Sequence, residues 1–144
     1  ALDVANYFLA SIDEEAGDLI SNLKLQKLLY YAQGFYLAIN NRPLFSEEIE
    51  TWIHGPVVPE VYHAFKNHGS EGIPKPEQVD FNIYSSEVKS HLDEINKVFG
   101  QFSAWKLRNM THEEPPWKDI KTLPGLITQN SMKEYFKTQL VNEE

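Results

Sequence analysis

Apolar residues recur at every third or fourth position along most of this chain, which is the spacing of amphipathic helices. The spacing predicts a first helix over residues 2–12, ended by the polar, glycine-containing segment 13–18. A second helix is predicted to begin at Ser21 or Asn22 and to end at the polar residues 40–43. The N-terminal third of the chain is therefore expected to be largely helical.

The second predicted helix carries apolar side chains on two of its sides. One face is formed by Leu25, Leu28, Leu29, Ala32, Tyr36 and Ile39, and a separate stripe by Leu23, Tyr30 and Leu37. Such a helix is either enclosed by its own domain or covered on one side by another chain, and both arrangements stay open. Gly34 lies in its interior, where glycine costs roughly 1 kcal/mol relative to alanine. We therefore expect another backbone to cross close to Gly34.

The helical spacing is interrupted around residues 44–54. There, residues 50–53 (Glu-Thr-Trp-Ile) fit a short, half-buried strand, because Thr, Trp and Ile suit extended backbone. Gly55, Pro56 and Pro59 follow as the residues of a structural turn. Pro59 suits the first position of a helix, where its missing N–H would be unpaired in any case. We therefore predict a small antiparallel β element near residues 44–54 that leads through a turn into a helix.

Further helices are predicted after residues 68–76, a loop too short to separate two domains. Their candidate caps are Ser85 or Ser86, Ser103 and, within a capping box, Ser131. The expected fold is mainly α, with about six helices and the small β element in a single compact domain. The domain is expected to span residues 1–144.

Composition narrows the class of protein. The chain has no cysteine among its 144 residues, which excludes disulfides and thiolate zinc sites and favours a reducing, cytoplasmic setting. A formal net charge of -8 argues against a general nucleic-acid binder, which needs a basic surface. No apolar run approaches the roughly 20 residues that cross a bilayer, so we expect a soluble, unexported protein without a membrane partner.

Negative charge is concentrated in two parts of the sequence. Before the first cation, Lys24, the acids are Asp3, Asp13, Glu14, Glu15 and Asp18. A second acidic group occupies residues 47–50. A solvated surface explains such groups, and steering of a basic partner is the alternative.

The polar residues do not match the patterns of known catalytic or metal sites. His63 and His68 are five positions apart, whereas a zinc helix places its histidines four apart. His112 and Glu113 are followed by two prolines where a zinc-protease helix would continue. There is neither a serine-nucleophile elbow nor a glycine-rich phosphate loop. We therefore expect no catalytic residue, metal or cofactor, and a protein that is not an enzyme; a hydrolase using His54, His112 and Glu113 is the alternative.

Four separated blocks of sequence, taken in order, resemble a known family. The blocks are residues 23–34 (Leu-Lys-Leu-Gln-Lys-Leu-Leu-Tyr-Tyr-Ala-Gln-Gly), 43–45 with 48–52, 54–62 (His-Gly-Pro-Val-Val-Pro-Glu-Val-Tyr), and 111–113 with 116–117. Together they look like the Panacea antitoxin-like family, also described as phage-associated GepA-like or SocA-like proteins. The resemblance extends over almost the whole chain, from about Leu2 to Phe136.

The resemblance implies a small intracellular protein of bacteria and their phages that acts by binding another protein. Since the family includes antitoxins, it implies a module that neutralises a cognate toxin by direct binding. One well-known member delivers its toxin to an ATP-dependent protease, so a proteolytic adaptor is the alternative. Some relatives carry an extra DNA-binding segment that this chain has no room for, so direct nucleic-acid binding is not expected. A homo-oligomer stays open.

Residues of these blocks are the candidates for partner binding. Trp52, Tyr62 and Trp117 are the expected aromatic anchors, because aromatic side chains bury a large area at low entropic cost. His54 and His112, with Glu113 adjacent, are expected to hold the turns that present them. The alternative is that the aromatic residues form the core of the domain itself.

Overall fold

The computed structural model describes residues 1–12 and 19–140, which pack around a long central helix. Seven α-helices and three strands occur in these residues: α1 (Leu2–Ala10), α2 (Asn22–Asn40), β1 (Ile49–Trp52), β2 (Gly55–Val57), α3 (Pro59–Phe65), α4 (Ser86–Phe99), α5 (Ala104–His112), α6 (Pro115–Lys118), β3 (Gly125–Ile127) and α7 (Gln129–Lys137). Two short 3-10 turns, Lys66–His68 and Phe81–Ile83, lie between α3 and α4. The expected mainly α single domain with a small antiparallel sheet is therefore confirmed.

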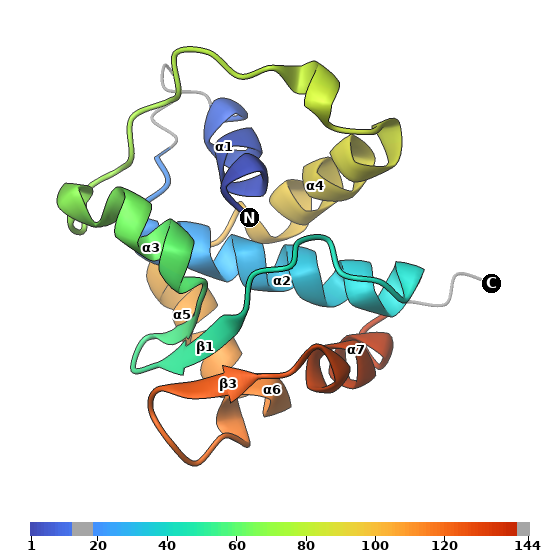
Figure 1. The fold of residues 1–144 in the computed structure, drawn as a ribbon. Coiled ribbons are helices and arrows are strands. Elements are labelled where there is room, and N and C mark those ends of the chain that lie inside the picture. The colour runs from blue at the N-terminus through green and yellow to red at the C-terminus, as the bar shows by residue number, and fades with distance from the viewer. Residues whose placement is uncertain (13–18, 141–144) are drawn as a thin grey trace.

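Helix α2 is enclosed by the rest of the domain. Figure 1 shows α2 crossing the middle of the molecule, with α1 and α4 on one side and the sheet, α6 and α7 on the other. Residues 25–34 are all buried, so the enclosed arrangement of the two that the sequence allowed is the correct one. Ile39 does not belong to this buried surface, because its side chain is 58% exposed in the last turn of the helix.

Gly34 allows the close approach of α7. A side chain at this position would overlap the aromatic ring of Phe136, which lies directly against the helix backbone. Helix α7 is the neighbouring element that lies against α2 here, and the atoms nearest to Gly34 are those of the Phe136 ring. The same ring packs edge-on against Tyr30, with ring centroids 5.4 Å apart. Gly34 therefore serves to bring α7 against α2.

Serine caps begin three of the helices as expected. The side chains of Ser21, Ser85 and Ser103 accept hydrogen bonds from backbone N–H groups in the first turns of α2, α4 and α5. The predicted start of the C-terminal helix is wrong by a few residues, because Thr128 is the cap of α7 and accepts from the Ser131 N–H. The first helix ends at Ala10, and the acidic segment 13–18 that was expected to end it lies outside the described residues.

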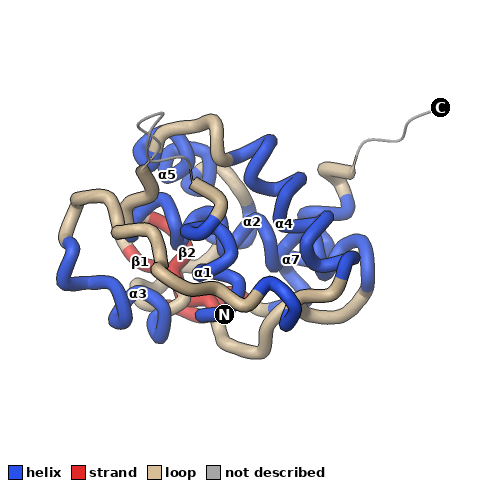
Figure 2. Tube along the Cα trace, turned by 90° about the horizontal axis from the view of Figure 1, so that it is seen from above, coloured by secondary structure: helices blue, strands red, loops and turns tan. Residues whose placement is uncertain are grey.

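The sheet has three short antiparallel strands in the order β2-β1-β3. Strand β1 pairs Thr51 with Pro56 of β2 and with Gly125 of β3. Figure 2 shows the strands gathered on the side of the molecule where α3 lies, with α4 on the opposite side. The predicted strand is confirmed, while β3 was not predicted, because a three-residue strand carries almost no periodicity of its own.

Candidate partner-binding site

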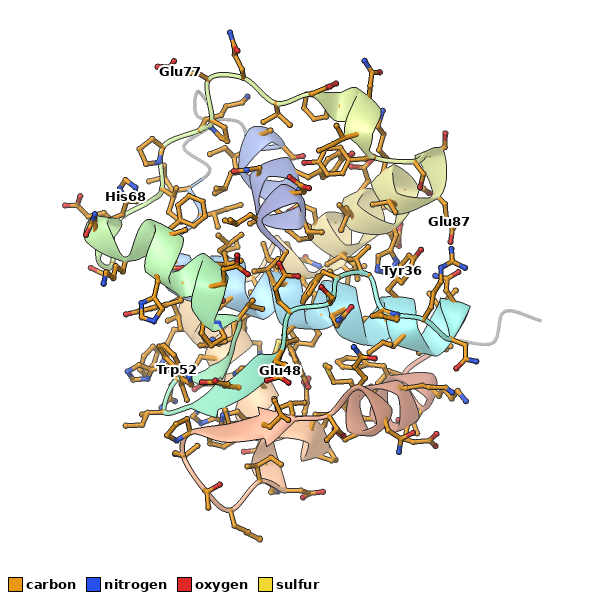
Figure 3. The ribbon with its side chains drawn as sticks, in the orientation of Figure 1. Tyr36, Glu48, Trp52, His68, Glu77 and Glu87 are labelled. Atoms are coloured by element: carbon orange, nitrogen blue, oxygen red, sulfur yellow. The ribbon has the colours of Figure 1, made fainter. Side chains whose placement is uncertain are left out.

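The Trp-Ile-His-Gly-Pro stretch forms the hairpin between β1 and β2. Trp52 ends β1 half-buried, and the two following residues, Ile53 and His54, are exposed. The Trp52 indole packs edge-on against the Tyr62 ring of α3, with centroids 4.9 Å apart, and its Nε1 donates to Glu50 Oε1 over 3.0 Å. Two of the three expected aromatic anchors therefore lie in contact beside the hairpin. Figure 3 labels Trp52 at this place.

A groove of about 720 Å³ opens between the hairpin, α3 and the first turns of α2. Its apolar lining includes Leu23, Trp52, Ile53, Val57, Tyr62 and Leu123. Glu50 and His54 add polar groups to the walls, and α2 adds the buried side chains of Gln26 and Lys27. Three of the candidate residues, Trp52, His54 and Tyr62, therefore line one groove.

Polar side chains of α2 close the outer edge of β2. The Lys27 ammonium donates to the Pro56 carbonyl over 3.0 Å, and the Gln26 carboxamide oxygen accepts from the Val58 N–H over 2.9 Å. Backbone groups two residues apart on a strand point to the same edge, so both hydrogen bonds satisfy the edge that does not face β1. Pro56 has no N–H of its own to leave unpaired there.

Only glycine fits at position 55. Its φ of +113° lies in a region that L side chains rarely adopt. A Cβ there would lie 2.6 Å from Lys27 Cε and 2.8 Å from Thr111 Oγ1. Gly55 thus lets the hairpin backbone approach α2 and α5, and Pro59 then begins α3 in the first helical position.

The fourth sequence block, residues 111–113 and 116–117, contacts the backbone of β1 from outside the groove. The His112 ring stacks on the Trp117 indole, with centroids 3.9 Å apart and an interplanar angle of 5°. Trp117 Nε1 donates to the Trp52 carbonyl over 2.9 Å. Neither His112 nor Trp117 is among the residues that line the groove. The structure thus brings Trp117 to the backbone of Trp52 but not to the surface that Trp52 and Tyr62 share.

Comparison with known proteins now decides the family. Residues 25–118, from the first turn of α2 to the end of α6, match the family described as Antitoxin SocA-like, Panacea domain. The chain belongs to this family. A relative named Antitoxin SocA, from Caulobacter vibrioides (strain NA1000 / CB15N), is 32% identical over 141 aligned positions, which cover 85% of this chain and 75% of the relative. No solved structure matches the chain.

Lys27 is an unusual feature of this Panacea domain, because its side chain is completely buried. Burial lowers the pKa of its ammonium to about 7, and the nearby Arg108 guanidinium acts in the same direction. Relative to water, the charged form is disfavoured by roughly 5 kcal/mol. Near neutral pH, Lys27 therefore exchanges between its charged and neutral forms while it is bonded to the hairpin.

The residues of the alternative hydrolase are not assembled into a catalytic group. Glu113 is 80% exposed at its side chain and lies 3.8 Å from the Lys118 ammonium. His54 Nδ1 accepts from Arg108 Nε over 3.4 Å, and burial lowers the pKa of His112. Within the described residues, neither imidazole is bonded to a carboxylate, and no group of three or more metal-ligating side chains occurs. The Panacea domain therefore gives the hydrolase no geometric support.

Two buried charged residues were not singled out from the sequence. Besides Lys27, Glu114 is buried, and its two carboxylate oxygens accept from the hydroxyls of Tyr30 and Tyr31 over 3.0 and 2.8 Å. Burial raises the pKa of Glu114 to about 7, although these hydrogen bonds act in the opposite direction. Lys27 lies between Gln26 and Leu28, and the local sequence carries no signal for its burial. The same holds for Glu114.

Three further points concern membrane crossing, the remaining tryptophan Trp105 and the general class of partner. In the parts of the chain that are described, no helix is long and apolar enough to cross a bilayer. Trp105 is 56% exposed and lies outside the groove, where the Arg108 guanidinium stacks 4.5 Å from its ring centroid. Family membership supports an antitoxin role, and hence a toxin as the general class of partner.

Proposed function

We propose that this Panacea domain neutralises a cognate toxin by binding it directly, in the cytoplasm, through the face that carries the groove. The observation that carries the proposal is the groove lined by Trp52, His54 and Tyr62, all of which belong to the family's sequence blocks. Trp117 and His112 support this face from outside the groove, by holding the backbone of β1.

The rim of the groove supports a protein partner. Ile53 is 66% exposed and Leu123 is 50% exposed, yet both line the same groove as the Trp52–Tyr62 pair. Exposed apolar side chains around partly buried aromatic rings are typical of interface anchors. A standard interface buries about 1,600 Å² in total, so a toxin that covered this face would extend well beyond the groove itself.

The test compares two isoleucines of similar exposure. Ile53→Ser changes the groove, whereas Ile83→Ser changes an isoleucine that is 56% exposed in the 3-10 turn before α4. With a cognate toxin identified as a protein that is toxic alone and tolerated together with this one, we expect Ile53→Ser to weaken binding about tenfold or more and to abolish growth rescue. Ile83→Ser is expected to leave toxin binding and growth rescue within about twofold of the parent protein. Equal effects of the two variants would contradict the proposal.

Delivery of the toxin to an ATP-dependent protease is the alternative mechanism. It depends on the acidic N-terminal part of the chain, of which residues 13–18 lie outside the described residues. Toxin half-life in cells with and without this protein separates the mechanisms. An unchanged half-life during rescue supports neutralisation by binding alone, and a shortened half-life that requires the protease supports delivery.

A further inference from the structure

We propose that the groove receives an amphipathic helix of the toxin, with an apolar side chain against Trp52 and Tyr62 and a Lys or Arg beside Glu50. This inference rests on the proposed function and adds the chemistry of the partner. Three features of the groove are its basis. The lining is mostly apolar, and it includes the carboxylate of Glu50. The backbone groups at the outer edge of β2 are already hydrogen-bonded to side chains of α2.

The carboxylate of Glu50 gives the groove its charge preference. Its Oε1 accepts from Trp52 Nε1, which holds the carboxylate next to the aromatic surface. Glu48 is exposed just before β1 and adds a second carboxylate near the strand, although it is not among the residues that line the groove. Figure 3 labels Glu48 and Trp52 at opposite ends of this strand. A basic side chain on a bound segment would therefore meet negative charge along β1.

The basic groups near the groove do not cancel this preference. Lys27 lines the groove from α2, but its side chain is completely buried and its ammonium donates to the Pro56 carbonyl. Arg108 is not among the lining residues; its guanidinium stacks on Trp105 and donates to His54. With a formal net charge of -8 on the chain, the field around the groove favours a cationic partner.

The closed edge of β2 favours a helix over an added strand. A peptide that extends a sheet needs free backbone N–H and C=O groups along an edge strand. At β2, the carbonyl of Pro56 and the N–H of Val58 are already bonded to Lys27 and Gln26. This edge therefore offers an added strand neither of these two groups, which favours recognition by side chains, as when an amphipathic helix lies in an apolar groove.

The test uses two synthetic peptides of about 18 residues, long enough for helix formation. Both carry the same leucine face, and the polar face carries either Lys and Gln or Glu and Gln. Fluorescence anisotropy with the whole chain is expected to show about tenfold tighter binding of the Lys peptide. Glu50→Gln is expected to weaken the binding of the Lys peptide about threefold or more, and Ile53→Ser is expected to weaken the binding of both peptides.

Matched controls separate the groove from general charge attraction. Glu94→Gln removes the same charge from an exposed position on α4, and we expect it to change the affinity by less than about 1.5-fold. Equal losses for Glu50→Gln and Glu94→Gln, or equal affinities for the two peptides, would overturn the inference. A dimer in sedimentation that Ile53→Ser dissociates would assign the groove to a second copy of the chain and overturn it as well.

The outcomes also separate this inference from the proposed function. If Ile53→Ser abolishes toxin binding while the peptides show no preference, the toxin uses this face but not through a basic helix. If the peptides behave as expected while Ile53→Ser leaves toxin binding intact, the proposed toxin-binding face is wrong.

Discussion

The two halves of α2 meet their surroundings in different ways. In the N-terminal half, Gln26 and Lys27 reach across to the backbone of β2, and a groove remains beside them. In the C-terminal half, Gly34 lets the Phe136 ring pack directly on the helix, next to Tyr31. Long polar side chains hold a neighbouring backbone at a distance, whereas aromatic rings fill the space between helices. The same buried helix thus borders a hollow surface at one end and a filled core at the other.

The largest effect on stability is expected where aromatic rings fill the space around the C-terminal half of α2, called the filled half below. Phe136→Ala removes a ring that is 1% exposed, and its loss should lower the free energy of unfolding by about 3–5 kcal/mol. Urea denaturation measures this loss. Ile39→Ala, near the exposed end of the same helix, is the control and should cost less than about 0.5 kcal/mol. Similar costs for the two variants would mean that α7 does not pack on α2 as described.

The buried lysine of the groove half should make stability rise with pH. Its pKa is 10.5 in the unfolded chain and about 7 in the folded one, so above pH 7 the unfolded chain binds more protons. The free energy of unfolding should therefore increase by about 2 kcal/mol between pH 7 and 9. Lys27→Met should remove this increase. A variant with the same slope as the parent protein would show that Lys27 keeps its ordinary pKa.

The buried glutamate of the filled half should have the opposite effect at lower pH. With a pKa of about 7 folded and 4.5 unfolded, Glu114 keeps its proton in the folded state between these values. Its contribution to stability is complete below pH 4.5 and is lost as the pH rises through 7, a decrease of about 2 kcal/mol between pH 5 and 7. Glu114→Gln should flatten that decrease in urea titrations at several pH values. A decrease that persists in the variant would assign it to other groups.

The smallest effect is expected at the groove itself. Trp52→Phe keeps an aromatic ring beside Tyr62 and removes the hydrogen bond from Nε1 to Glu50. Since Trp52 is only half-buried, the free energy of unfolding should fall by about 0.5–1 kcal/mol. Thermal unfolding of the variant checks this value. A loss above about 3 kcal/mol would place Trp52 in the core, which was the alternative left open by the sequence.

Local signals explain which parts of the fold the sequence could predict. Ser21, Ser85 and Ser103 were recognisable as caps because a cap acts within its own first turn. The assignment of Ile39 to the buried face was wrong, because helical spacing does not show where the covering helices end. Strand β3 was missed because its three residues depend on pairing with distant β1.

Distance along the chain also explains which parts of the candidate site could be predicted from the sequence and which were missed. Trp52, His54 and Tyr62 are close in sequence around one turn, so their common location could be anticipated. The burial of Lys27 and Glu114 depends on helices that are distant along the chain, and no local pattern reports it. Whether the candidate residues bind a partner stays a prediction.

The absence of cysteine allows a direct test of the proposed toxin-binding face. Ile53→Cys and Ile83→Cys each place a single thiol at an exposed position, one in the groove and one before α4. The rate of thiol modification is measured with and without the toxin. We expect the toxin to slow modification of the thiol at position 53 about tenfold or more and to leave that at position 83 within about twofold. Unchanged modification at position 53 in the bound complex would contradict the proposal that the groove faces the toxin.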